Sequence, residues 1–384
     1  MKLLFLVQGK TIDNHPGFDD AFQKLLAEGV ISGYQAIPYH AYVEKGNWQE
    51  LWDRVVALCR DEVIDLVFFQ FYHSRNNPSP EPCIRRLRSL PQRPTIFTSA
   101  GDPFSYDWRL PDYPASFKQC SRLCDLTFST QMGKAADKMA AWGARNIVLN
   151  PLSVCQKRFI KGHQTDPTTH KFDFDLVMLG SHNKPWPNPF HHHFWGFRKR
   201  MKVVTLLYKR YGKRFGLFGR GWNGWKCWQG PIPFDEQQTA FRRGRLVVDG
   251  YPYSTADYYL SDRPFFALAA AIPVITYHVP RIETLLRPEE HWYLHDDTPG
   301  LLRLCDRLLA QNAEELYSKS NAAARYVEER HTQYHRVKAI VQTASQYHME
   351  TLSKKPHALP LLPFFLDDIK LSQQHAFALR NWKG

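Results

Sequence analysis

Short runs of apolar residues alternate with longer amphipathic stretches throughout the first 155 residues. The runs predict buried strands, and the amphipathic stretches predict helices between them. The predicted strands are 2–8, 34–38, 65–71, 94–99, 126–130 and 146–150. The predicted helices are 17–28, 48–61, 82–90, 114–124 and 134–142. Helices that separate nearly continuous apolar strands predict a parallel sheet with both faces covered.

The same alternation restarts after a polar segment, 156–172, which we predict to be a linker. Strands are predicted at 174–179, 214–218, 245–249 and 272–276, and helices at 197–211, 262–270, 300–311, 314–330 and 333–352. The chain is therefore expected to be an α/β protein with two Rossmann-like domains, 1–155 and 173–340. Their parallel sheets should face each other across a cleft, as suits a reaction between two substrates. The apolar tail within 341–384 should pack back on the domains.

The positive charge of the chain is concentrated in one quarter of its length. Lys and Arg total 50 against 37 Asp and Glu, which gives a net charge of +13. Residues 151–250 hold 18 of the basic and 6 of the acidic residues, so this segment alone carries +12. Such a local field suits an anionic partner, such as phosphate, nucleic acid or a lipid headgroup. A chance imbalance on an ordinary surface is the alternative.

Composition narrows the class of protein further. No apolar run approaches the roughly 18 residues of a membrane helix, and the five from Leu3 to Val7 are too few for a signal peptide. We therefore expect a cytoplasmic protein. The seven cysteines include no CxxC pair, which argues against a disulfide framework or a zinc cluster.

Glycines follow several predicted strands. Gly9-Lys10 is not a P-loop, because Leu4 stands where that motif needs its first glycine. Gly9 could still let a ligand approach the backbone, and Gly180-Ser181 could offer backbone N–H groups to a phosphate. A simple turn is the alternative for both. The loop GLFGRGWNGW leads to Trp222, Trp225 and Trp228, whose rings could stack on a base or sugar or could pack in the core.

Residues 174–340 resemble the C-terminal half of group-1-type glycosyltransferases, in particular the spore-maturation-protein-like subgroup. The family pattern runs from a strand ending in Gly-Ser, through Gly-x-Gly-Trp and Arg-x-Phe-Glu-Ala-x-Ala-x-Gly, to His-Thr-x-x-x-Arg. The corresponding residues here are Gly180, Ser181, Gly219, Gly221, Trp222, Arg263, Phe265, Ala267, Ala269, His331, Thr332 and Arg336. Two positions depart from the pattern: Phe266 replaces the Glu that contacts the donor ribose, and Ala271 replaces the closing Gly.

The resemblance implies a GT-B architecture, with a nucleotide-sugar donor in the C-terminal domain and the acceptor in the N-terminal one. The donor would be a UDP-sugar or another nucleoside-diphosphate sugar, with no further cofactor. The expected donor-binding residues are Gly180, Ser181, Gly219, Arg220, Gly221, Trp222, Tyr253, Ser254, Asp257 and Arg263. Among them, Arg263 at a helix start could neutralise the leaving diphosphate. A surface ion pair is its alternative role.

The sequence offers little support for a metal. Asp173-Phe174-Asp175 has the spacing of a metal-binding carboxylate pair, but it opens a predicted strand. Three adjacent histidines, His191–His193, cannot all turn toward one ion from a helix. We therefore expect a metal-independent enzyme that transfers a hexose or a pentose.

An inverting enzyme needs a base for the acceptor hydroxyl. Asp102, directly after the fourth strand, is the first candidate, and His15 is the second. Gly9, Asp19 and His73 also follow strands of the first domain and are candidate acceptor contacts. The basic helix adds three cationic candidates, Arg198, Arg200 and Lys202.

The acceptor stays open between classes. The cationic helix favours a phosphate backbone, and hence a hydroxyl on a hydroxymethylated base in DNA. The family resemblance favours a bacterial surface glycan, a lipid-linked precursor or a protein, with anionic membrane as the surface the cations would touch. A catalytically inactive anion-binding module is the third alternative, supported by Phe266.

Overall fold

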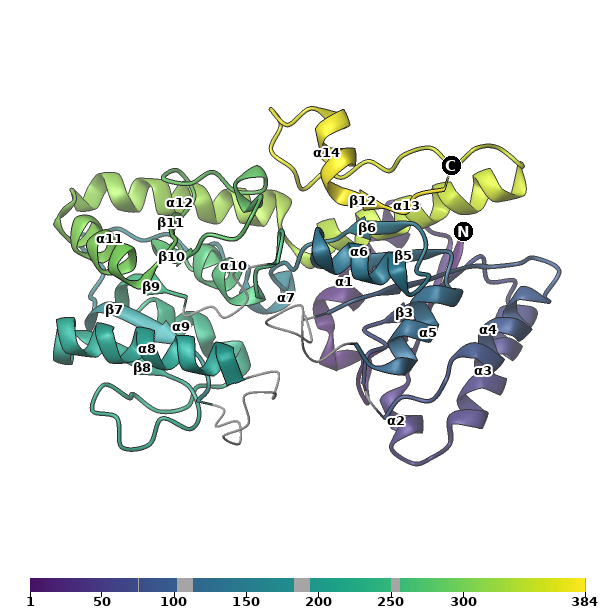
Figure 1. The fold of residues 1–384 in the computed structure, drawn as a ribbon, viewed down its shortest axis with the longest axis horizontal. Helices are drawn as coiled ribbons and strands as arrows, with labels where there is room; N and C mark the ends of the chain where they lie inside the picture. The colour runs from purple at the N-terminus through teal and green to yellow at the C-terminus, as the bar shows by residue number, and fades with distance from the viewer. Residues whose placement is uncertain (75, 102–112, 183–193, 250–255, 384) are drawn as a thin grey trace. The chain divides into compact units, whose positions relative to one another are not determined.

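The computed structural model describes residues 1–74, 76–101, 113–182, 194–249 and 256–383 (Figure 1). These residues form two compact units. One holds the described residues up to Pro151 and those from Gln333 onward, and the other holds those from Leu152 to Thr332. This division differs from the predicted bounds, since 156–172 groups with the second unit and 333–340 with the first. Residues 333–340 belong to the first unit because the helix that starts at Gln333 packs on that unit.

The first unit is built on a seven-stranded sheet with the order β12-β6-β5-β4-β3-β1-β2. Its strands are β1 (Lys2–Val7), β2 (Gly33–Pro38), β3 (Leu66–Gln70), β4 (Thr95–Ser99), β5 (Leu126–Ser129), β6 (Ile147–Leu149) and β12 (Leu379–Arg380). All neighbours pair in parallel except β12, which runs antiparallel to β6.

Alternate side chains of the first sheet face opposite helical layers. Its helices are α1 (Pro16–Ala27), α2 (His40–Val43), α3 (Trp48–Asp61), α4 (Glu81–Arg88), α5 (Ala115–Leu123), α6 (Lys134–Ala141), α13 (Gln333–Leu352) and α14 (Leu371–Ala378). Leu4 and Leu6 belong to one core with residues of α3, α4 and α5. Phe5 instead contacts Phe18 and Phe22 of α1. Burial on both faces explains why these strands are apolar without a polar period.

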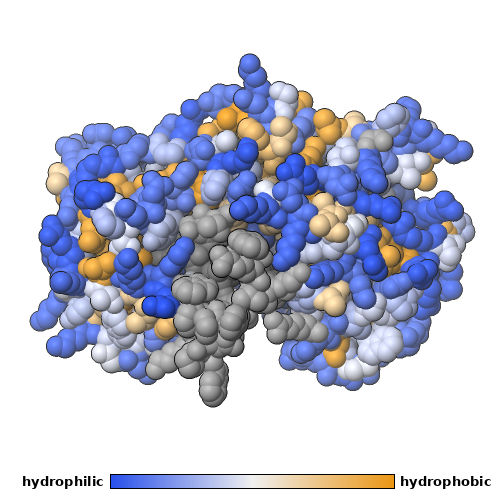
Figure 2. All heavy atoms as spheres, viewed as in Figure 1, coloured by the Kyte–Doolittle hydropathy of each residue, from blue (hydrophilic) through white to orange (hydrophobic). Residues whose placement is uncertain are grey.

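The C-terminal segment returns to the first sheet, as its apolar character suggested. Helix α13 packs against α1, β3 and β4, and the short β12 closes the sheet edge. Phe364, Phe365 and Leu366 are buried in the connection between α13 and α14. Apolar side chains also reach the surface there (Figure 2), including Leu361, which is 72% exposed.

The second unit is built on a five-stranded parallel sheet with the order β11-β10-β9-β7-β8. Its strands are β7 (Phe174–Leu179), β8 (Phe215–Phe218), β9 (Gly244–Val248), β10 (Val274–Tyr277) and β11 (Tyr293–His295). Its helices are α7 (Gln156–Phe159), α8 (Phe194–Tyr211), α9 (Gln237–Phe241), α10 (Asp262–Ala269), α11 (Thr298–Ala310) and α12 (Ala313–Arg330). One core joins α8 and α11 to β7, β8, β9 and β10, while α9, α10 and α12 pack together elsewhere in the unit.

The predicted strands and long helices are confirmed, with ends displaced by a few residues at most. The sequence analysis missed β11 and β12, which are only three and two residues long. It also missed the short helices α2, α7 and α9 and the tail helix α14. Segments this short carry too few apolar positions for a period to be recognised.

Candidate functional site

The ends of β7 and β8 meet at the carboxyl edge of the second sheet. The Gly180 N–H donates to the Phe218 carbonyl (3.0 Å), and the His182 N–H donates to the Arg220 carbonyl (2.8 Å). The ladder between the two strands thus continues into the loops that follow. The expectation that the Gly180 N–H stays available for a phosphate is therefore wrong, because this pairing uses it.

Two glycines make this close approach possible. Gly219 has φ +126°, and a Cβ there would lie 2.3 Å from the Gly180 carbonyl oxygen. Gly221 has φ +85°, and a Cβ there would lie 2.6 Å from the His182 carbonyl oxygen. No other residue tolerates both the backbone conformation and the contact. The Gly-x-Gly element therefore fixes the shape of the edge.

Trp222 fastens this loop from inside the core. Its side chain is fully buried, and its Nε1–H donates to the Gly180 carbonyl over 2.6 Å. Trp228 makes the equivalent bond to the Gly219 carbonyl (2.8 Å), and Trp225 packs against the same core. A ring without exposed surface cannot stack on a ligand. Trp222, predicted as a donor contact, therefore supports the loop from behind, and core packing is the alternative that the structure shows for this ring.

Arg200 reaches the same edge from α8. Its Nη1 donates to the Ser181 carbonyl (2.8 Å). Its guanidinium lies against Gly180, where an added Cβ would be 3.3 Å from the Arg200 Nε. The sequence analysis placed Arg200 with the acceptor. The structure instead brings it to Gly180 and Ser181, two of the predicted donor residues.

A buried carboxyl group lies in the middle of this edge and was missed by the sequence analysis. Asp249 directly follows β9, is 5% exposed, and accepts a hydrogen bond from the Thr276 hydroxyl (3.3 Å). Burial raises the pKa of Asp249, while the positive charges of Arg263 and Arg200 oppose that rise. An Asp that ends a predicted buried strand was the available signal.

Arg263 lies in the first turn of α10, the helix that follows β9 along the chain. Its charge acts on Asp249, as does that of Arg200. The structure thus brings together Gly180, Ser181, Arg200, Asp249 and Arg263 from two strand ends and two helices. The positive end of the α10 dipole adds to the field that an anion would meet here.

Two other predicted donor residues have different surroundings. Asp257 forms an ion pair with Arg281 (3.4 Å). Arg220 is exposed in the loop after β8. Tyr253 and Ser254 lie outside the described residues, as do Asp102 and the three histidines His191–His193.

The carboxyl edge of the first sheet gathers part of the predicted acceptor set. The His15 and His73 rings both pack on Phe71, with centroids 6.3 and 5.9 Å away. Gly101 allows His73 to approach, since a Cβ there would lie 2.7 Å from the His73 Nε2. Phe71 itself has φ +46°, an unusual conformation for a bulky residue and one found most often at functional sites.

Gly9 and Asp19 are engaged in local structure of the first unit. A Cβ at Gly9 would lie 2.6 Å from the Asn14 Oδ1, the atom that accepts the Lys10 and Thr11 N–H groups. Asp19 accepts a hydrogen bond from the Tyr34 hydroxyl (3.2 Å). A tight turn therefore requires a glycine at position 9. The hydrogen bond of Asp19 joins α1 to Tyr34 of β2.

Two buried polar side chains at this edge were missed by the sequence analysis. Gln70 and Ser99 end β3 and β4 and are direct partners in the ladder. The Gln70 Oε1 accepts the Gln8 N–H (3.1 Å), but within the described chain neither the Gln70 Nε2 nor the Ser99 Oγ has a hydrogen-bond partner. Their apolar neighbours in sequence concealed them.

The basic side chains of α8 divide into two groups. Arg210 pairs with Asp306 (2.8 Å), and Arg214, just beyond the helix, pairs with Asp175. Arg198 and Lys202, predicted as acceptor contacts, are exposed on the helix surface. The cationic stripe is therefore confined to part of the helix.

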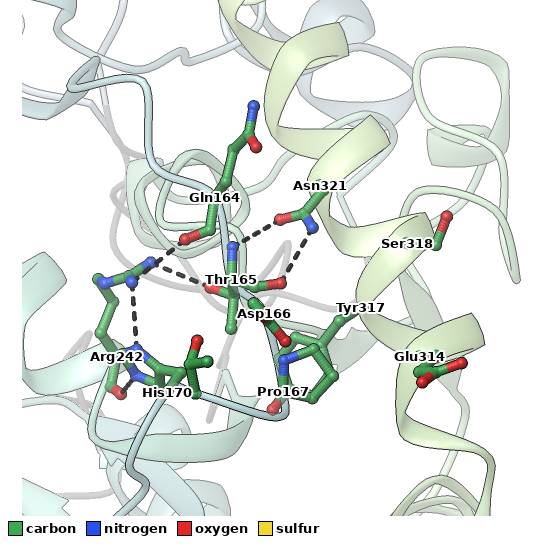
Figure 3. A pocket seen from close by; sticks show the side chains of 11 residues that line it. Gln164, Thr165, Asp166, Pro167, His170, Arg242, Glu314, Tyr317, Ser318 and Asn321 are labelled. Atoms are coloured by element: carbon green, nitrogen blue, oxygen red, sulfur yellow. Dashed lines mark hydrogen bonds between the residues drawn. The ribbon is translucent and has the colours of Figure 1, made fainter.

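An open pocket of about 600 Å³ lies at the opposite, amino edge of the second sheet (Figure 3). Arg242 donates there to the Thr165 hydroxyl (3.0 Å) and to the Gln164 carbonyl (3.3 Å). Asn321 bonds both the N–H and the carbonyl of Thr165 (2.8 and 3.0 Å). These polar groups satisfy one another. The hydrogen bonds from Arg242 and Asn321 therefore hold the predicted linker, 156–172, on the second unit.

Comparison with known proteins identifies part of the chain. Residues 198–342 match the family model described as glycosyl transferase-like. The matched segment is less than half of the chain. It includes Arg200, Asp249 and Arg263, and so covers most of the edge described above. No curated protein is significantly similar to the chain.

Solved structures establish the fold as GT-B-like. Sucrose-phosphate synthase from Thermosynechococcus elongatus has a TM-score of 0.56 at 12% identity, over 92% of this chain and all of that one. A trehalose-6-phosphate synthase has 0.56 at 10%, over 90% of this chain and 99% of its own. Anabaena Alr3699/HepE in complex with UDP and glucose has 0.52 at 14%, over 92% of this chain and all of its own.

The glycosyl transferase-like segment uses its two departures from the family pattern structurally. Phe266 is 2% exposed and stacks on Phe159 of α7, with centroids 3.9 Å apart. Ala271 adopts φ +57°, the left-handed conformation that the family's glycine favours. The backbone of the motif is therefore kept, while Phe266, which stands where the pattern has Glu, packs on α7 within the second unit.

No helix in the described ranges is long and apolar enough to cross a membrane. The same residues contain no group of three or more His, Cys, Asp or Glu side chains placed to hold a metal ion.

Proposed function

We propose that the protein transfers a hexose or pentose from a nucleoside-diphosphate sugar to an acceptor hydroxyl. The donor's diphosphate would bind at the carboxyl edge of the second sheet. Ligands of open parallel sheets bind at that edge, and the glycosyl transferase-like segment contains it. The subgroup suggested by the sequence, resembling spore-maturation proteins, remains part of this proposal.

One observation carries the proposal: Arg200 lies against Gly180 and Ser181 at that edge, and its charge and that of Arg263 both act on the buried Asp249 carboxyl group. Arg200 is fixed by the Ser181 carbonyl, and Arg263 opens α10. A guanidinium group can donate two parallel hydrogen bonds to phosphate oxygens, and it stays charged at every relevant pH. They can therefore stabilise the charge that develops on a leaving nucleoside diphosphate.

The similar structures support this class of donor. Anabaena Alr3699/HepE was solved with UDP and glucose, and two other similar structures are sugar-phosphate synthases. We propose a UDP-sugar or a related donor for this chain. Since Phe266 is packed away, the ribose must be held by other residues, and Tyr253, Ser254, Asp257 and Arg220 are the proposed contacts.

We propose that the reaction needs no metal, because the guanidinium pair and the α10 dipole supply the positive charge. Turnover should then be unchanged when EDTA replaces Mg²⁺. A large loss in EDTA that Mg²⁺ restores would contradict this part of the proposal.

The acceptor would bind at the carboxyl edge of the first sheet. We propose Asp102 or His15 as the base, with Gly9, Asp19 and His73 shaping the site. His15 and His73 share the Phe71 ring, which supports a common role. Replacing His15 by Gln should lower kcat and leave donor affinity unchanged, whereas a loss of donor affinity alone would argue against a base.

For the acceptor itself, the local charge of +12 favours an anionic molecule, and we propose a hydroxymethylated base in duplex DNA, bound through Arg198 and Lys202. Such binding should weaken steeply with salt. Failure of duplex DNA to bind in low salt would exclude it. Binding to anionic vesicles would then favour a lipid-linked or surface glycan acceptor.

A donor screen tests the main proposal. Thermal unfolding of the full chain is measured with nucleoside diphosphates and their sugars, since a ligand that binds the folded state raises Tm. We expect a shift with at least one donor, lost in Arg263→Ala and Arg200→Ala. Lys209→Ala is the matched control, because it removes an exposed cation of α8 away from the edge.

Slow hydrolysis of the donor in the absence of acceptor separates an enzyme from an inactive module. A donor that binds but is never hydrolysed or transferred would favour the anion-binding module. No shift with any donor would refute the proposed donor site.

A further inference from the structure

Asp249 is a buried carboxyl group at the centre of the edge. The β7–β9 register pairs Val177 with Val247, so Asp249 follows β9 beside the end of β7, where Gly180 begins. Its backbone N–H donates to the Ile275 carbonyl (2.8 Å), and its Oδ2 accepts a hydrogen bond from the Thr276 hydroxyl. A carboxylate removed from water needs compensating charge or hydrogen bonds. One hydroxyl alone is modest compensation.

Compensation comes from the two arginines of the proposed diphosphate site. The charges that act on Asp249 are those of Arg263 on α10 and Arg200 on α8. The neighbouring residues bring no charge: Ser181 follows β7, and Thr276 lies on β10. The same guanidinium groups would therefore serve two anions: the carboxylate when the site is empty, and the diphosphate when a donor is bound.

We propose that Asp249 and the donor diphosphate share Arg200 and Arg263, so that the Asp249 carboxylate takes up a proton from solvent as the diphosphate binds. This inference rests on the proposed function. The bound anion draws on the positive charge and adds negative charge beside a carboxylate that is already desolvated, so the neutral acid is favoured. No covalent bond changes, and the proton returns to solvent when the nucleotide leaves.

Linkage gives the sign of the effect. If binding is accompanied by proton uptake, affinity rises as pH falls through the range in which Asp249 is ionised in the empty protein but protonated in the complex. Above that range the ionised carboxylate opposes the diphosphate. Asp249 would thus favour release of the nucleoside diphosphate product at neutral pH, while the donor gains from its contacts with the sugar.

The test uses inorganic pyrophosphate, which probes the diphosphate site whatever the nucleoside. Its dissociation constant is measured by calorimetry for the full chain and for Asp249→Asn between pH 5 and 8.5. Ionisation of the probe cancels in the ratio of the two constants. We expect Asp249→Asn to bind on the order of tenfold more tightly at pH 8, from one charge acting across roughly 10 Å of protein with an effective dielectric of about 20. The ratio should approach one at low pH.

Two further variants keep the outcome interpretable. Asp175→Asn removes a carboxylate at the opposite end of the same sheet, where Asp175 pairs with Arg214, and should follow the unmodified chain at every pH. Thr276→Val removes the hydrogen bond to the Asp249 carboxylate and should move the pH dependence to higher pH. This second variant also tests the idea if Asp249→Asn folds poorly.

The possible results separate the inference from the proposed function. Equal affinity of Asp249→Asn and the unmodified chain at all pH values would overturn the shared-charge role, and so would weaker binding by the variant at pH 8. If the unmodified chain binds neither pyrophosphate nor any nucleotide sugar, the diphosphate site itself is wrong. Fewer protons taken up by Asp249→Asn, compared in buffers of different ionisation enthalpy, would independently support the coupling.

Discussion

A single methyl group at Gly219 should disrupt the carboxyl edge of the second sheet. The added Cβ of Gly219→Ala would lie 2.3 Å from the Gly180 carbonyl oxygen, at a backbone φ of +126°. Ordinary contacts of this kind are at least about 3.4 Å, so the two loops must separate by roughly 1 Å. Gly180 cannot move without weakening the bond from the buried Trp222 Nε1.

The magnitude follows from two terms. An alanine held at this φ costs about 1–3 kcal/mol. Loss of the buried Trp222 hydrogen bond adds about 1–3 kcal/mol. We therefore expect Gly219→Ala to destabilise the second unit by about 2–6 kcal/mol, the sum of the two terms. Since the Ser181 carbonyl that holds Arg200 would shift with Gly180, donor affinity should also fall.

Gly224→Ala isolates the contact from the backbone term. Gly224 lies in the same loop with φ +88°, but a Cβ there meets no atom within 4 Å. It should cost only about 1–2 kcal/mol and leave donor affinity unchanged. Urea unfolding followed by Trp fluorescence compares the two variants. Equal midpoints for Gly219→Ala and Gly224→Ala would show that the contact with Gly180 does not constrain the edge.

Three further predictions concern packing and pH. Phe266→Glu should lower stability by at least about 3 kcal/mol without improving donor affinity, because the carboxylate would enter an aromatic cluster; Phe266→Leu is the control, and tighter donor binding by the Glu variant would show that the family contact is accessible. Burial lowers the pKa of His348, so at acidic pH the unfolded chain binds a proton that the folded chain does not bind, and the free energy of unfolding should fall as pH drops below about 6.5. His348→Gln should reduce that fall. An unchanged pH dependence of urea unfolding in this variant would refute the prediction. Arg242→Lys should expose the segment around Thr165 to proteolysis, since a lysine cannot reproduce the forked hydrogen bonds, and unchanged cleavage rates would contradict this role.

The strand and helix pattern could be predicted because both sheets are buried on two faces. Strands such as Leu66–Gln70 are almost wholly apolar and stand out from the helices around them. β12 could not be predicted, since two residues near the C-terminus pair with β6 over more than 200 residues of sequence. The domain division had the same difficulty, because α13 continues the sequence of the second unit but packs on the first.

The candidate site was predictable where the chain topology alone decides position. Gly180, Ser181 and Arg263 follow strands of one parallel sheet, and their convergence needs no knowledge of side-chain packing. The roles of Trp222 and Arg200 could not be predicted in this way. A Trp in a glycine-rich loop is easily predicted to be exposed, because the sequence does not show the core behind it. The basic residues of a helix are easily assigned to one surface, because the sequence does not show where each side chain points.

The position of Arg200 at the carboxyl edge reduces the positive charge that is left for the rest of the surface. Of the 18 basic residues in 151–250, at least five form ion pairs with Asp side chains: Arg158, Arg210, Arg214, Arg243 and Arg245. Exposed pairs of this kind contribute little to stability, but they do neutralise the field at their positions. Arg200 is directed toward the Ser181 carbonyl, at the proposed diphosphate site. The positive charge available to an anionic acceptor is therefore smaller than the net charge of +12 implies. Arg198 and Lys202, which are exposed near the start of α8, are part of what remains.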